Sequence, residues 1–83
     1  MSIQREAVVV LLKEFFEVRA VVVSEADFES FDFIAAGVLD SFEVLSMIMH
    51  IEAHFGLSVP PELLLESSNA QVGNFVDAIV ALA

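Results

Sequence analysis

The sequence predicts an all-α fold, a four-helix bundle of three main helices and one short one. Three segments carry apolar residues at the three- and four-residue steps of an amphipathic helix. Only the run 21–23 has the β-branched residues of a strand, and it lacks a second run to pair with. The chain has 83 residues, 58% of them hydrophobic, so we expect a single domain over 1–83 with an adequate core.

The first main helix is predicted over residues 2–19, with Ser2 as its N-cap. Residues 24–40 are predicted as a long loop with short turns, in which acidic residues alternate with Phe28, Phe31 and Phe33. A loop of this length is usually either functional or packed. The phenylalanines therefore predict that it lies against the core.

The second main helix is predicted over residues 41–55, and Gly56 is a natural stop. One broad side of this helix is formed by Val44, Leu45, Ile48, Ile51, Glu52 and Phe55. A second side is formed by Glu43, Met47, His50 and His54. We expect the first side to face the core and the second to face outward.

The last third of the chain is predicted to hold a short helical turn over 61–65 and then the third main helix. Ser68 or Asn69 is the expected N-cap of that helix, and Gly73 should weaken it by about 1 kcal/mol relative to alanine. The residues expected to line the core or the space beside it are Leu45, Ile48, Ile51, Phe55, Val72, Phe75, Val76 and Ile79.

The charge balance excludes several classes of function. Three basic and thirteen acidic residues give a net charge of −10, which argues against nucleic-acid binding and against anionic membrane surfaces. It favours partners with basic docking patches. There is no cysteine, hence no disulfide, thiolate nucleophile or cysteine metal site. The apolar run 7–12 is too short to span a membrane, so we expect a cytoplasmic protein without membrane insertion.

The pair Asp40-Ser41 opens the second main helix. Asp40 is a good N-cap, and Glu43 three residues later completes a capping box with Asp in place of Ser or Thr. On these residues alone, two interpretations stay open. Ser41 is either an ordinary residue at the first helical position or a hydroxyl that anchors a phosphate-linked group, which a helix N-terminus favours.

Three segments together resemble the acyl carrier and peptidyl carrier protein family, over essentially the whole chain. They are Gly37-Val38-Leu39-Asp40-Ser41-Phe42, Glu52-Ala53-His54-Phe55-Gly56 and Val59-Pro60. The resemblance implies that a phosphopantetheinyl transferase esterifies the Ser41 hydroxyl with 4′-phosphopantetheine from coenzyme A. The thiol of that arm would hold an acyl or aminoacyl group as a thioester. Asp40 would cap the helix and be read by the transferase.

The same resemblance implies a monomeric carrier, not an enzyme, that serves a loading ligase and a downstream acyltransferase or synthase. The second main helix would dock these partners through Phe42, Glu43, Met47 and His50. Ser46 and Ala53 stand where many fatty-acid-synthesis carriers have acids. A free-standing specialised or D-alanyl-type carrier is therefore expected.

Two other hypotheses concern binding without a prosthetic group. The chain could be an acidic helical protein-interaction module that uses its apolar excess, with Ser41 unmodified. His50 and His54 share a helix face and could hold a metal, but no third ligand is near them in the sequence. We therefore expect no metal site, and no Ser/His/Asp triad can be built.

Overall fold

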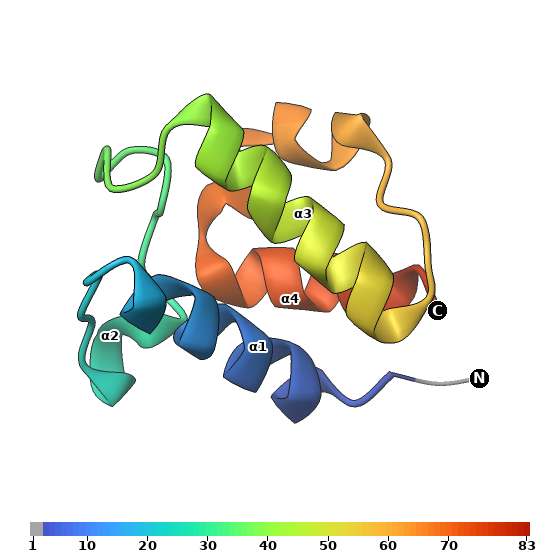
Figure 1. The fold of residues 1–83 in the computed structure, drawn as a ribbon, viewed down its shortest axis with the longest axis horizontal. Coiled ribbons are helices and arrows are strands. Elements are labelled where there is room, and N and C mark those ends of the chain that lie inside the picture. The colour runs from blue at the N-terminus through green and yellow to red at the C-terminus, as the bar shows by residue number, and fades with distance from the viewer. Residues whose placement is uncertain (1–2) are drawn as a thin grey trace.

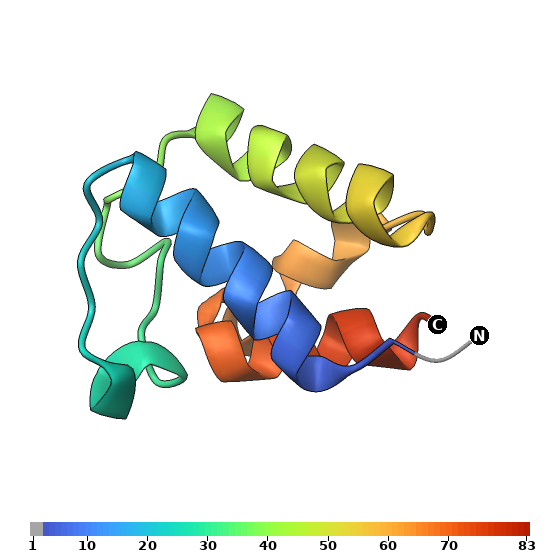
Figure 2. The same ribbon diagram turned by 60° about the horizontal axis from the view of Figure 1, so that its bottom comes forward.

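The computed structural model describes residues 3–83. Within them lie the helices α1 (Arg5–Val18), α2 (Glu25–Phe28), α3 (Ser41–Phe55) and α4 (Val72–Ala81), with the 3-10 helices η1 (Pro61–Leu65) and η2 (Ser67–Ala70) before α4. Figures 1 and 2 show α1, α3 and α4 packed together, with the start of α1 and the end of α4 at the same end of the bundle. Over this range there is no strand beyond one isolated bridge, and the predicted all-α fold is confirmed.

Helix α1 is shorter than predicted at its start. It begins at Arg5 after Gln4, which makes no side-chain cap, while Ser2 lies outside the described residues. At its other end Ala20 has a φ of 59°, and Val21 N–H donates to the carbonyl of Phe16 at 2.9 Å. This is a Schellman-type stop with alanine in the position that glycine usually takes.

The long connection after α1 lies against the core, as predicted. Phe28 and Phe33 are buried, and the Phe33 ring lies 5.7 Å from that of Phe75 on α4. Two backbone hydrogen bonds join the same segments. Phe33 N–H donates to the carbonyl of Ala70 at 3.1 Å, and Val72 N–H donates to that of Phe31 at 3.0 Å. The loop is thereby fastened to the beginning of α4.

The predicted cap of the last helix is wrong. Ser68 and Asn69 belong to η2, and α4 begins after Gln71 without a side-chain cap. Asn69 instead donates its side-chain N–H to the carbonyl of Leu63 at 2.7 Å. Gly73 is buried, and a Cβ there would lie 3.1 Å from the carbonyl oxygen of Glu29. The glycine thus permits close approach of two backbone segments.

Most of the predicted core is confirmed, with Leu45 the exception. The predicted core residues that are fully buried are Ile51, Val72, Phe75, Val76 and Ile79, and Ile48 and Phe55 pack against them partly buried. Leu45 is 54% exposed, whereas Met47 is fully buried. Helix α3 is therefore rotated relative to the predicted orientation. None of the helices in residues 3–83 is long and apolar enough to cross a membrane.

Candidate functional site at the start of α3

The turn before α3 is built by Asp32 and Gly37. One carboxylate oxygen of Asp32 accepts the N–H groups of Ile34 and Ala35 at 3.0 and 2.7 Å. Gly37 then takes a φ of +66°, which glycine adopts readily. Leu39 is buried and anchors the chain just before the helix begins.

The predicted capping box is present. Oδ1 of Asp40 accepts the N–H of Glu43 at 2.8 Å, and Oε1 of Glu43 accepts the N–H of Asp40 at 3.1 Å. Ser41 follows as the first residue of a 15-residue helix and is exposed. The first N–H groups of a helix have no intrahelical partner and its dipole is positive at this end. An exposed hydroxyl here is well placed to carry a phosphate ester.

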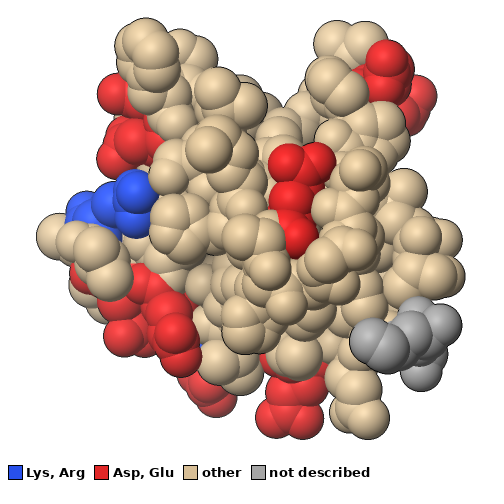
Figure 3. Space-filling view, turned by 45° about the vertical axis from the view of Figure 1, so that its right-hand side comes forward, with Lys and Arg blue, Asp and Glu red and all other residues tan. Residues whose placement is uncertain are grey.

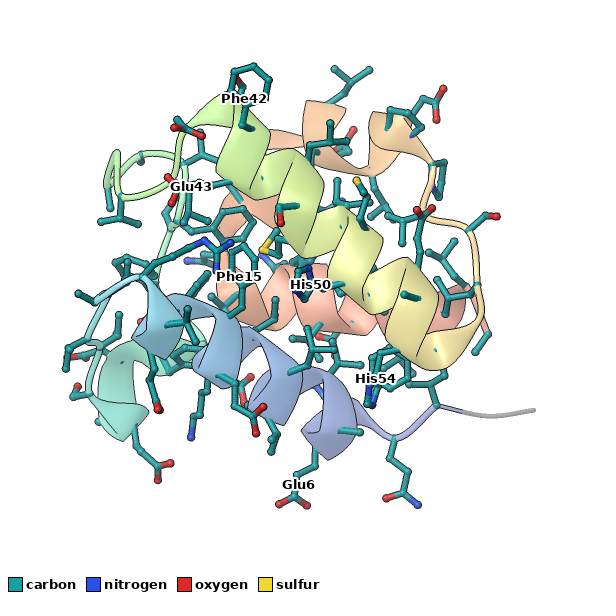
Figure 4. All side chains as sticks on the ribbon, in the orientation of Figure 1. Glu6, Phe15, Phe42, Glu43, His50 and His54 are labelled. Atoms are coloured by element: carbon teal, nitrogen blue, oxygen red, sulfur yellow. The ribbon has the colours of Figure 1, made fainter. Side chains whose placement is uncertain are left out.

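The side of α3 expected to face outward lies along α1 (Figure 4), where His50 and His54 remain exposed as expected. Glu43 pairs with Arg19 at 3.4 Å, and the ring of His50 lies 5.6 Å from that of Phe15. His50 and His54 line a groove of about 380 Å³ between the two helices. Met47, on the same side, is fully buried, so its predicted outward contact is wrong.

The outward side of α3 is apolar. Phe42 is 81% exposed, Leu45 54% and Met49 57%. Their spacing of three and four residues places them in one row along the helix, and exposed Ala53 continues it. The row starts beside Ser41. Leu45 was expected in the core and the exposed row was not predicted, although its three- and four-residue spacing is visible in the sequence.

Neither carboxylate of α3 is free on this outward side. Glu43 is held by Asp40 N–H and Arg19, and Oε2 of Glu52 accepts the N–H of Val59 at 2.8 Å. Figure 3 shows a largely uncharged face with acidic side chains near its centre and toward its edges. Within residues 3–83, no group of three or more His, Cys, Asp or Glu side chains is placed to hold a metal ion.

Comparison with protein families assigns the chain to one family. The family model described as phosphopantetheine attachment site matches residues 6–79. The chain belongs to this family. Its members are carrier proteins, not enzymes, and they bear a covalently attached 4′-phosphopantetheine on which modifying and partner enzymes act. Comparisons with curated proteins and with solved structures found no match.

The match agrees with the local structure. The phosphopantetheine arm needs a hydroxyl that a transferase can reach, and it brings a phosphodiester that needs compensation of its negative charge. The start of α3 offers an exposed hydroxyl at Ser41 and unpaired backbone N–H groups beside it. The residues present therefore fit the group.

Proposed function

We propose that the Ser41 hydroxyl is the attachment point of the phosphopantetheine arm, and that the protein carries acyl or aminoacyl groups between enzymes. When bound, the arm supplies a thiol that holds the cargo as a thioester. The chain contains no cysteine and so has no thiol of its own for this purpose. The observation that carries the proposal is the exposed position of Ser41 at the first turn of a capped helix within the matched range.

Asp40 and Glu43 fix the first turn that holds the Ser41 hydroxyl, but they do not remove its proton. Both carboxylates accept backbone N–H groups of the capping box. His50 lies nine residues along α3, which is about 13 Å in helix rise, and its ring lies against Phe15. The base that removes the Ser41 proton therefore comes from the transferase. Asp40 contributes to recognition by holding the serine in a fixed first turn.

Partner enzymes dock, in this proposal, on the exposed row that begins at Phe42 and continues through Leu45 and Met49, with His50 at its margin. The partners are the phosphopantetheinyl transferase, a loading ligase for acyl or aminoacyl groups, and a downstream acyltransferase or synthase. The row is adjacent to Ser41 and lacks a free carboxylate. This favours a specialised or D-alanyl-type carrier whose partners present an apolar surface to the row.

Intact mass tests the attachment site. After co-expression with a broad-specificity phosphopantetheinyl transferase, the wild-type mass should rise by one phosphopantetheine, and Ser41→Ala should show no rise. Ser46→Ala is the matched control, because Ser46 lies on the same helix, and it should shift like the wild type. An unshifted wild type, or a shifted Ser41→Ala variant, would overturn the proposal.

A further inference from the structure

Arg19, at the end of α1, contacts the capping box of α3 from outside. Its Nε lies 3.4 Å from Oε2 of Glu43, while Oε1 of the same carboxylate accepts the N–H of Asp40. One carboxylate thus joins Arg19 to the backbone of the residue before Ser41. In Figure 4, Glu43 lies on the side of α3 toward the end of α1, and Phe42 points away from α1.

Arg19 is itself held in a defined orientation. Its Nη1 donates to the carbonyl of Phe15 at 3.2 Å, and its guanidinium carbon lies 3.6 Å from the centroid of the Phe15 ring. Phe15 is buried, and the Arg19 side chain is only 24% exposed. A planar guanidinium can stack and donate in two directions at once, which a lysine ammonium cannot reproduce.

The partner of Arg19 distinguishes it from the other two basic residues. Arg5 pairs with Glu29 and Asp77, and Lys13 pairs with Glu25. Across residues 3–83, Arg19 is the basic side chain that reaches α3. It offsets one of the two carboxylate charges that flank Ser41, where an anionic phosphate has to approach.

We propose that Arg19 is a positioning residue for the modification of Ser41 and acts through Glu43. It holds the carboxylate that fixes the Asp40 N–H, and it reduces the negative charge that coenzyme A meets at the start of α3. This inference rests on the proposed attachment at Ser41. Loss of Arg19 leaves Glu43 uncompensated and free to turn away from the capping box.

The test compares Arg19→Gln with the wild type in two measurements on the isolated apo protein. The first is kcat and KM for loading by a broad-specificity phosphopantetheinyl transferase with coenzyme A. The second is the amide hydrogen-exchange rate of Asp40, which reports the capping box without any loading. We expect kcat/KM to fall about fivefold, the size of one partly exposed ion pair, and Asp40 exchange to accelerate. Arg19→Lys keeps the positive charge but not the planar guanidinium. It should therefore recover only the electrostatic part of the loss in kcat/KM, which is the part that high salt removes.

Two controls separate positioning from general stability. Arg5→Gln removes the ion pairs at the opposite end of α1, and it should leave both measurements at wild-type values. The double variant Arg19→Gln/Glu43→Gln should load no more slowly than Glu43→Gln alone, because Arg19 acts through Glu43.

The outcomes are distinct for the two proposals. A wild type that is never loaded overturns the attachment site and the positioning role with it. A wild type that loads while Arg19→Gln keeps the same kcat/KM and Asp40 exchange overturns only the role of Arg19. Equal slowing by Arg5→Gln, or additive losses in the double variant, also overturns it.

Discussion

Replacement of Phe42 by alanine tests whether the apolar row on α3 docks partner enzymes. The ring is 81% exposed, so nearly the whole side chain is available to a partner. Burial of about 160 Å² of a phenylalanine at about 25 cal/mol per Å² gives an upper bound of about 4 kcal/mol. Only part of this burial free energy appears as binding free energy, because association also costs entropy and desolvation. We therefore expect a loss of about 1.4–2.8 kcal/mol, a tenfold to hundredfold rise in Kd.

The assay is titration calorimetry of the apo protein with a catalytically inactive broad-specificity phosphopantetheinyl transferase. The unfolding free energy of Phe42→Ala should stay within about 0.5 kcal/mol of the wild type, because the ring is exposed. Val22→Ala is the matched control, since Val22 is 90% exposed but lies in the connection after α1. Wild-type affinity in Phe42→Ala, or an equal loss in Val22→Ala, would refute the docking row.

Three further predictions concern stability. Ala20 has a φ of 59°, a conformation that costs an L-residue about 1 kcal/mol or more. Ala20→Gly should therefore raise the unfolding free energy, measured in urea, by about 0.5–1 kcal/mol. A decrease would show that the backbone at Ala20 is not strained. Gly73→Ala should lower the unfolding free energy by about 1 kcal/mol in the same assay. The added Cβ would contact the Glu29 carbonyl at 3.1 Å, and this cost outweighs the gain of about 1 kcal/mol in helix propensity. An increase would show that the segment around Glu29 shifts to make room. The hydrogen bond from Arg5 holds the pKa of Glu29 below its usual value, so this contribution to stability is present above the unfolded pKa and lost as pH falls through the folded pKa. The stability advantage of the wild type over Arg5→Gln should accordingly shrink below about pH 4.5, and a constant gap between about pH 6 and about pH 3 would exclude this linkage.

The start and the end of α3 were predictable because their signals are local. The capping box joins Asp40 to a residue three positions away, and Gly56 ends the helix with a φ of 65°. Neither feature depends on the rest of the fold. The position of Ser41 at the first turn follows directly from them.

The orientation of α3 was not predictable from its own sequence. Apolar side chains occur on nearly every side of this helix, so the hydrophobic pattern does not decide which side is buried. Polar Glu43 and His50 suggested an outward side. Their partners are Phe15 on α1 and Arg19 just after its end, far away in the sequence. Because these partners accommodate the polar groups, α3 turns that side toward α1 and exposes Leu45.

The orientation of α3 separates two contributions to partner recognition. The net charge of −10 produces a long-range field that steers basic partners, and salt screens this effect. Only two of the thirteen acidic residues, Glu43 and Glu52, lie on α3, so the field originates mainly on other elements. In the proposed docking mode, contact beside Ser41 is apolar and governs dissociation more than encounter. Burial of an apolar row is favourable only where the partner surface fits it closely enough to exclude water, so in the proposed function the shape of that surface selects the enzymes that the carrier serves.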